Sequence, residues 1–317
     1  MTPWIRRMIS TAMLAPLALL AACGGGSGFD SDADISALAQ RAPELTTLAE
    51  AVKATGLSVT LSSPGPYTVL APTNAAFDSL LTELGLTKDA LMADRALLET
   101  VLKYHVLPGR IARADIASGK AVEPLGGGFF KIDASNTERI ATDGRNRTAR
   151  LQLTDLAAAN GLVHVVDRVL LPANRTLMQT VQADASLGHL AIALAATGLA
   201  DTLSDAGPFT LLAPTNAAFD ALAAELALTP AQLLADVPLL RRVLAYHIVE
   251  VRLLRADLPL GQHVTTQLGR AVSFTATAGA GMQVTDECGC SANLLRTDIL
   301  GANGALHVID KVLKPAP

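Results

Sequence analysis

The chain is poor in the residues that several protein classes require. Aromatic residues make up only 3% of its 317 residues and the formal net charge is −4, which excludes a strongly basic nucleic-acid-binding protein with base-stacking platforms. Three cysteines are too few for a disulfide scaffold or a four-cysteine zinc site. What the chain does have is hydrophobic material, because half of its residues are apolar, enough for the cores of about two globular domains.

The first residues indicate export. Arg6 and Arg7 precede a short apolar stretch at residues 9–22, which is too short to span a ~30 Å hydrocarbon core as a helix. We therefore predict a signal peptide over residues 1–22; the alternative is a buried N-terminal helix. Cys23 follows Leu-Ala-Ala, an arrangement that resembles the lipobox of bacterial lipoproteins, in which the cysteine is lipidated and becomes the first residue.

The lipobox resemblance implies a membrane-anchored lipoprotein. Residues 23–33 would form the lipid anchor and a Gly-, Ser- and Asp-rich flexible tether, and several acyl chains together hold a protein stably on a membrane. Because Gly24 rather than aspartate follows Cys23, resemblance to known sorting signals implies the outer rather than the inner membrane. The sequence leaves open whether the protein faces the periplasm or the outside.

The rest of the chain is one unit that occurs twice. Residues 66–81 return as residues 208–223, and residues 160–172 return as residues 303–315. Such a long repeat is typical of tandem globular domains, so we predict domain 1 over residues 34–173 and domain 2 over residues 174–317. Each unit is large enough to build a core of its own.

Each unit begins with helical patterns and ends with strands. Apolar residues recur at helical spacing over residues 45–52 and 187–194, and Gly56 and Gly198 stand where these helices should end. Later in the units, Asn160-Gly161 and Asn303-Gly304 separate extended runs, which predicts two hairpins. Helices that precede strands in this way indicate the α+β class.

The repeated blocks resemble the fasciclin-like domain family. The marks are Thr-x-Leu-Ala-Pro-Thr-Asn-x-Ala-Phe, a Tyr-His pair and a final Asn-Gly-x-x-His block, all present in both units. The resemblance implies two tandem domains, each a wedge of two small β-sheets with flanking helices. It also implies an extracellular role in cell adhesion or matrix contact rather than an enzyme.

Four of the six histidines are related by the repeat. His105 and His247 lie on apolar helical faces, each after a tyrosine (Tyr104 and Tyr246), and His164 and His307 lie in apolar strands. No spacing among them is typical of a metal site or a catalytic base, so we interpret the Tyr-His pairs and the two strand histidines as structural. No cofactor is expected.

Two short segments remain as candidate sites. Cys288-Gly289-Cys290 is predicted on a loop, where the cysteines form either a strained disulfide or two inert thiols, and a redox role stays open.

In the fasciclin-like family a known adhesion segment with an Asp-Ile pair precedes the last block. Asp298-Ile299 matches it in domain 2 and Asp155-Leu156 matches it less well in domain 1. The structural alternative is that Asp298 caps a turn while Ile299 and Leu300 pack inward.

Two function classes follow from these observations. The leading hypothesis is a surface-anchored, non-enzymatic adhesion or interaction protein that contacts a protein, a polysaccharide or a host surface. The alternative is a periplasmic or surface carrier of a small apolar ligand, which would need an apolar pocket of about 300–1,000 Å³. No nucleic-acid partner is expected, and the sequence gives no indication of an obligate oligomer.

Overall fold

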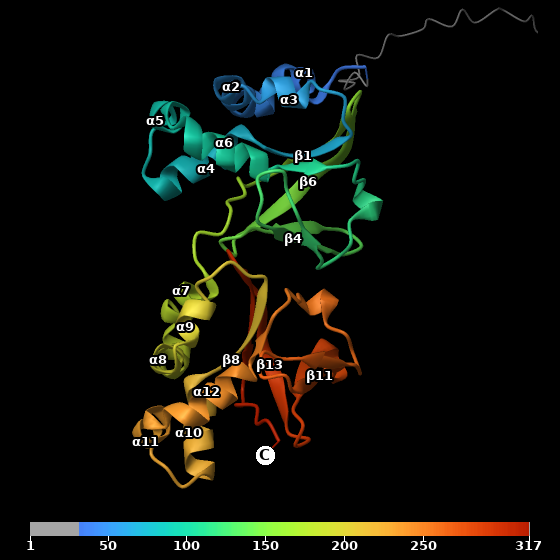
Figure 1. Ribbon diagram of the computed structural model, residues 1–317. Helices are drawn as coiled ribbons and strands as arrows, with labels where there is room; N and C mark the ends of the chain where they lie inside the picture. Colours follow the sequence, from blue (N-terminus) through green and yellow to red (C-terminus); the bar gives the residue numbers. More distant parts are fainter. Residues whose placement is uncertain (1–31, 317) are drawn as a thin grey trace, which may run out of the picture.

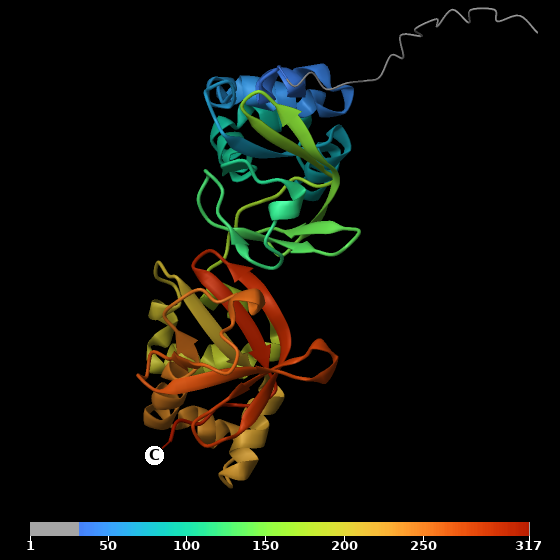
Figure 2. The ribbon, with the colours of Figure 1, turned by 90° about the vertical axis from the view of Figure 1, so that its right-hand side faces the viewer.

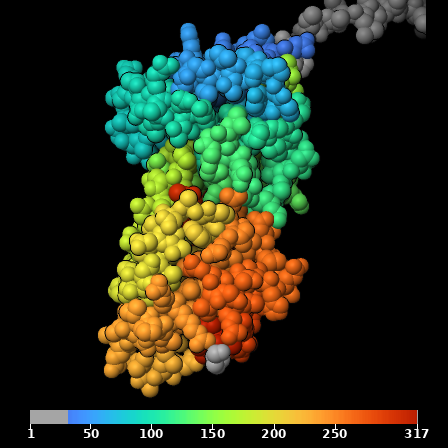
Figure 3. Space-filling view, in the orientation of Figure 1, coloured from blue at the N-terminus to red at the C-terminus, as the bar shows by residue number. Residues whose placement is uncertain are grey.

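The computed structural model describes residues 32–316, so the predicted signal peptide, Cys23 and nearly all of the tether lie outside the described residues. The described chain forms two domains stacked end to end, each with helices on one side and strands on the other (Figure 1). This confirms the α+β class. The space-filling view shows the two domains in contact as two lobes (Figure 3). None of the helices within residues 32–316 is both long and apolar enough to cross a membrane.

Domain 1 runs through six helices and seven strands in the described residues. Its helices are α1 Ile35–Arg41, α2 Thr46–Thr55, α3 Ser58–Leu61, α4 Asn74–Leu84, α5 Lys88–Ala93 and α6 Arg95–Tyr104. Its strands are β1 Tyr67–Pro72, β2 Val106–Pro108, β3 Ala121–Val122, β4 Phe130–Ala134, β5 Arg139–Thr142, β6 Thr148–Ala158 and β7 Gly161–Val166.

Domain 2 repeats this order element by element. Its helices are α7 Leu177–Gln182, α8 Gly188–Thr197, α9 Leu199–Thr202, α10 Asn216–Glu225, α11 Pro230–Ala235 and α12 Val237–Ala245. Its strands are β8 Phe209–Pro214, β9 Ile248–Val249, β10 His263–Thr265, β11 Ala271–Ala276, β12 Met282–Thr285, β13 Ser291–Gly301 and β14 Gly304–Ile309. The predicted boundary between residues 173 and 174 falls between β7 and α7, and independent folding of the two units stays a prediction.

The strands of each domain follow the order β2-β1-β7-β6-β5-β4-β3, with the matching order in domain 2. The long strand β6 joins two smaller groups of strands, because residues 148–150 pair with β5 and residues 151–158 pair with β7. The two small sheets expected from the family are thus connected through one shared strand. In the group formed by β1, β2, β7 and the second half of β6, β1 runs parallel to β7. Helix α1 packs against β7, the strand that contains the Asn-Gly-x-x-His block.

Local sequence signals explain where the helices begin and end. Gly56 and Gly198 have φ of 75° and 74° and end α2 and α8, as predicted, since only glycine adopts this left-handed conformation without strain. Thr73 and Thr215 cap α4 and α10, and each hydroxyl accepts a hydrogen bond from the backbone three residues later.

The Asn-Gly pairs form the two predicted hairpins and also tie each domain together. The Asn160 amide donates to the carbonyls of Leu61 and Ser63 and accepts from the backbone of Ile35. A side chain at Gly161 would place its Cβ 1.9 Å from the Tyr67 carbonyl, so only glycine fits there. Asn303 and Gly304 repeat these contacts in domain 2.

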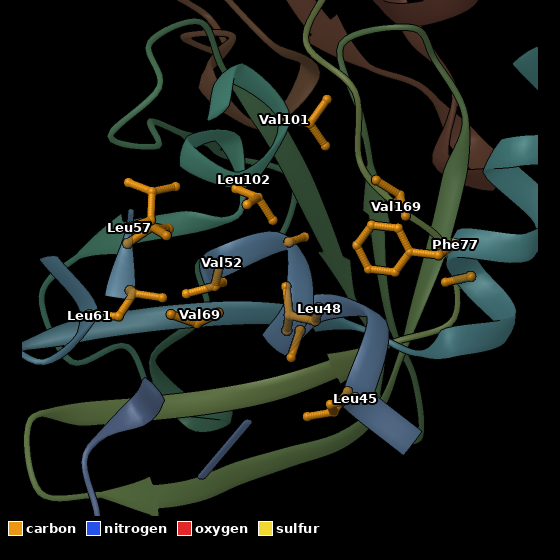
Figure 4. Packing of buried hydrophobic residues seen from close by; sticks show 14 of the residues in the cluster. Leu45, Leu48, Val52, Leu57, Leu61, Val69, Phe77, Val101, Leu102 and Val169 are labelled. Carbon is orange, nitrogen blue, oxygen red and sulfur yellow. The ribbon is translucent and has the colours of Figure 1, made fainter. Parts of the chain in front are cut away.

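Each domain has one apolar cluster between its helices and strands and a second one among its strands. Figure 4 shows the first of these in domain 1, where side chains from α2, α6 and β1 meet around Leu48 and Phe77. The histidines and aspartates considered below lie at the edges of these clusters.

Candidate functional site

The Tyr-His histidines join the end of a helix to a distant backbone segment. His105 Nδ1 donates to the Val101 carbonyl at 2.7 Å, and its Nε2 accepts from the Leu170 N–H at 2.9 Å. His247 makes the same two bonds, to Val243 and Leu313, at 2.7 and 3.0 Å. Burial lowers the pKa of both histidines to about 4, so both rings are neutral near pH 7 with both nitrogens engaged.

The tyrosines of the pairs are engaged in the same way. The Tyr104 hydroxyl donates to the Phe129 carbonyl at 2.5 Å and accepts from the Gly144 N–H at 3.1 Å. The Tyr246 hydroxyl donates to Ala271 at 2.6 Å and accepts from Glu287 at 3.1 Å, and burial raises its pKa to about 12. These contacts leave neither hydroxyl poised as a catalytic group, and the structural role of the pairs stays a prediction.

The strand histidines hold a bulge in the strand next to them. His164 Nδ1 accepts from the Asp155 N–H at 3.1 Å while its Nε2 donates to the Ile111 carbonyl at 2.9 Å. His307 makes matching bonds to Asp298 and Leu253. Both aspartates have positive φ, 61° and 58°, at register shifts in β6 and β13. Each histidine therefore fixes the backbone conformation of the segment that corresponds to the family's adhesion segment.

Asp298 is buried in the contact between the two domains. Its Oδ1 accepts from the Arg255 N–H at 2.6 Å, and its Oδ2 forms a 2.8 Å ion pair with Lys131 of domain 1. Ile299 packs against the helix-side cluster of domain 2, and Leu300 is buried. In the described chain, then, Asp298 faces domain 1 rather than solvent.

Apolar and polar contacts surround this ion pair. Phe129 of domain 1 packs with Leu254, Leu300 and Ala305 of domain 2, and the Arg252 guanidinium lies 4.3 Å from the centre of its ring. The Asn146 amide donates to and accepts from the Leu300 backbone, at 3.0 and 2.7 Å. Figure 2 shows the β13–β14 hairpin reaching towards the strands of domain 1.

Asp155 has the same local geometry but an open surface. Its Oδ1 accepts from the Arg113 N–H at 2.8 Å, as Asp298 does from Arg255. Its Oδ2, the atom that corresponds to the one paired with Lys131, has no hydrogen bond to any other described residue. Asp155 is exposed, Leu153 beside it is 48% exposed, and Leu156 packs inward.

Cys288 and Cys290 lie on the predicted loop, between β12 and β13. Both are free and exposed in the structure, so no disulfide joins them there, and the possible pairing stays a prediction. The Asp286 carboxylate fixes the loop, because one of its oxygens accepts from both cysteine N–H groups at 2.9 Å. Arg145 and Arg147 occupy the corresponding positions in domain 1.

Two features bear on whether the protein could hold a metal ion or a small ligand. No group of three or more His, Cys, Asp or Glu residues in the described part of the chain could hold a metal ion. An apolar pocket of about 440 Å³ lies in domain 1 among α1, α2, α3 and the strands β1, β2 and β7. No single lining residue signals this pocket in the sequence; the signal lies in the smaller side chains of domain 1 at positions where domain 2 has larger ones.

Comparison with known proteins places these features in a family. The fasciclin domain model matches residues 43–172 and 185–315. Pig transforming growth factor-beta-induced protein ig-h3 is 29% identical over 268 residues, which cover 80% of this chain and 35% of that protein. Human periostin is 29% identical over 262 residues, 81% of this chain and 28% of that protein. The chain thus spans about a third of the length of these relatives.

A shorter relative and a solved structure complete the comparison. Immunogenic protein MPB70 of Mycobacterium bovis is 32% identical over 144 residues, 44% of this chain and 68% of that protein. A FAS1 domain pair from the insect cell adhesion molecule fasciclin I covers 86% of this chain and 97% of its own, with a TM-score of 0.44 and 19% sequence identity.

Proposed function

Since the chain belongs to the fasciclin domain family, we propose that it is a non-enzymatic interaction protein, held at the outer membrane by lipidated Cys23 and contacting an extracytoplasmic protein through domain 1. The histidines and tyrosines shared by the two domains support this reading, because their polar atoms are taken up by backbone hydrogen bonds.

The observation that carries the proposal is the contrast between Asp298 and Asp155. The two residues have the same backbone conformation and the same histidine and backbone partners. In domain 2 this segment binds another folded surface, namely domain 1. In domain 1 the same segment is exposed, so a second protein surface can dock on it in the same manner.

The contact in domain 2 indicates the chemistry of the partner. Asp298 binds an ammonium group and Leu300 packs on an aromatic ring. A partner for Asp155 would accordingly present a lysine or arginine beside an apolar residue. Charge pairs at the edge of such a contact favour association at low salt and weaken as salt rises.

Carriage of a small apolar ligand remains the second candidate function. The pocket of about 440 Å³ in domain 1 favours it, because its volume lies within the ~300–1,000 Å³ typical of small-molecule sites.

The anchoring part of the proposal is tested by acylation. Radiolabelled fatty acid should enter the wild-type chain and not the Cys23→Ser variant. Cys288→Ser/Cys290→Ser is the matched control and should keep the label. Labelling of Cys23→Ser would show that the lipobox reading is wrong.

The contact part is tested with a charge-neutral variant. Asp155→Asn keeps an oxygen for the Arg113 N–H and tolerates the positive φ, so the fold should be retained while the carboxylate is lost. Captured envelope and surface proteins are compared for residues 24–317 with and without Asp155→Asn, at low and high salt, next to a glycan array. A salt-sensitive partner lost in the variant supports the proposal. An unchanged set of partners, or binding to glycans alone, contradicts it.

A further inference from the structure

The apolar pocket of domain 1 is a partly open hollow whose mouth carries polar residues. Its apolar walls come from α1, α2, α3, β1, β2 and β7, and its mouth is lined by Gln40, Glu50, Lys53 and Ser58. Figure 4 shows Val52, Leu57, Leu61, Val69 and Leu102 gathered on this side of the cluster. Protein cores are normally close-packed, so an apolar hollow of this size cut into the edge of a core requires a reason.

The repeat shows how the space arises. The two domains share their register here, so each wall residue of domain 1 has a counterpart in domain 2. At six buried wall positions domain 1 has the smaller side chain, and at no buried wall position does it have the larger one. The six are Ser36, Ala39, Val52, Val69, Val106 and Val163, where domain 2 has Met178, Val181, Leu194, Leu211, Ile248 and Leu306.

The larger residues of domain 2 are all buried in its own core. The six smaller residues of domain 1 therefore all reduce side-chain volume around the same pocket, rather than being scattered through the domain. A cavity of this kind costs stability when it is empty, and an apolar ligand that fills it restores the lost contacts.

The walls also restrict what can enter. His105 lines the pocket, but both of its ring nitrogens are engaged by the backbone, so it offers no hydrogen bond to a ligand. The Ser36 hydroxyl accepts from the Gln40 amide at 3.3 Å. The body of a ligand must then be apolar.

Among the described residues that line the pocket, Lys53 is the one cation. Glu50 is neutralised by a 2.6 Å ion pair with Lys88. Lys53 is exposed and forms no ion pair with any described residue. Domain 2 has Ala195 at this position. Domain 1 therefore has both the smaller wall side chains and an additional positive charge.

We propose that domain 1 binds one long-chain fatty acid, with its alkyl chain in the pocket and its carboxylate at Lys53. The proposal gives the second candidate function its ligand class. It depends neither on the acylation of Cys23 nor on the contact at Asp155, so its failure would leave the proposed interaction function standing.

Binding is tested with palmitate on the soluble chain of residues 24–317, which lacks Cys23 and so carries no acyl chain of its own. Titration calorimetry after removal of bound lipid should show saturable binding of one palmitate per chain. Absence of saturable binding would overturn the proposal.

The site is located by exchanging residues between the repeats. Ser36→Met/Val69→Leu/Val163→Leu should weaken palmitate binding by about tenfold or more, because it fills the pocket with the residues of domain 2. Met178→Ser/Leu211→Val/Leu306→Val is the matched control and should leave the affinity unchanged. Melting temperatures confirm that the filled variant is folded. A folded, filled variant that binds palmitate as the wild type does would contradict the pocket assignment.

The carboxylate is tested with Lys53→Ala and a neutral ligand. This variant should weaken palmitate several-fold and leave binding of 1-hexadecanol unchanged, since only palmitate carries the charge. An equal effect on both ligands, or none on either, would contradict the role of Lys53.

Discussion

Replacement of His105 by alanine should destabilise domain 1 by roughly 2–4 kcal/mol. The ring is buried and bridges the end of α6 to the segment after β7. Its loss removes packed volume and leaves both the Val101 carbonyl and the Leu170 N–H without their partner in the interior. His105→Asn and His105→Gln should cost less, because each keeps one of the two hydrogen bonds.

The same histidine makes domain 1 sensitive to acid. The pKa of His105 is about 4 in the folded chain and near 6.5 when exposed, because burial disfavours the charged ring. Between these values the unfolded chain binds a proton that the folded chain does not. The contribution of His105 to the free energy of unfolding of domain 1 should therefore be at its maximum above pH 6.5. It should decrease by about 3 kcal/mol as the pH drops towards 4. His105→Gln removes this contribution.

Hydrogen–deuterium exchange with mass spectrometry measures backbone protection in each of the two domains of the intact chain. Tryptophan fluorescence does not report on either domain, because the only tryptophan, Trp4, lies in the predicted signal peptide. For His105→Ala, exchange should rise in α6 and β7 and stay unchanged in α12 and β14; His247→Ala should give the opposite pattern. Wild-type protection in His105→Ala, or protection that is independent of pH from 6.5 to 4 in the wild type, would refute the reasoning.

Three further changes test other parts of the account. Residues 34–173 and 174–317, expressed separately, should each give a cooperative thermal transition; a molten product from either would place the boundary elsewhere. Lys131→Met should loosen the domain contact at a cost of about 3 kcal/mol, because it leaves the Asp298 carboxylate buried without a cation, and exchange should rise at residues 297–301. Gly161→Ala should lower the free energy of unfolding of domain 1, measured in urea, by more than about 3 kcal/mol, since its Cβ would overlap the Tyr67 carbonyl. Wild-type stability of this variant would contradict the close approach of Gly161 to Tyr67.

Features set by neighbouring residues could be read from the sequence. Gly56 ends its helix, Thr73 caps the next one, and Asn160-Gly161 forms the hairpin, because each depends on local backbone geometry. The burial of the Tyr-His histidines also followed a local pattern, an apolar stripe at helical spacing.

Features that join distant segments could not be predicted in this way. The partner of Asp298 is 167 residues away in the other domain, so nothing near Asp298 signals that it is buried. The pocket depends on small residues from two helices and three strands, none of which is unusual alone. The sequence reveals the pocket only when repeat-related residues, such as Val69 and Leu211, are compared in size.

The most direct test of the proposed interaction function is site-specific photocrosslinking in intact cells. A photoreactive residue at Leu153, beside the open Asp155, is compared with one at Arg296, the matching position in domain 2, which pairs with Asp184 of its own domain at 2.5 Å. The account predicts a defined protein adduct at residue 153 that Asp155→Asn abolishes, and no such adduct at residue 296. Adducts at residue 296 alone, or adducts at residue 153 that persist in Asp155→Asn, would contradict it.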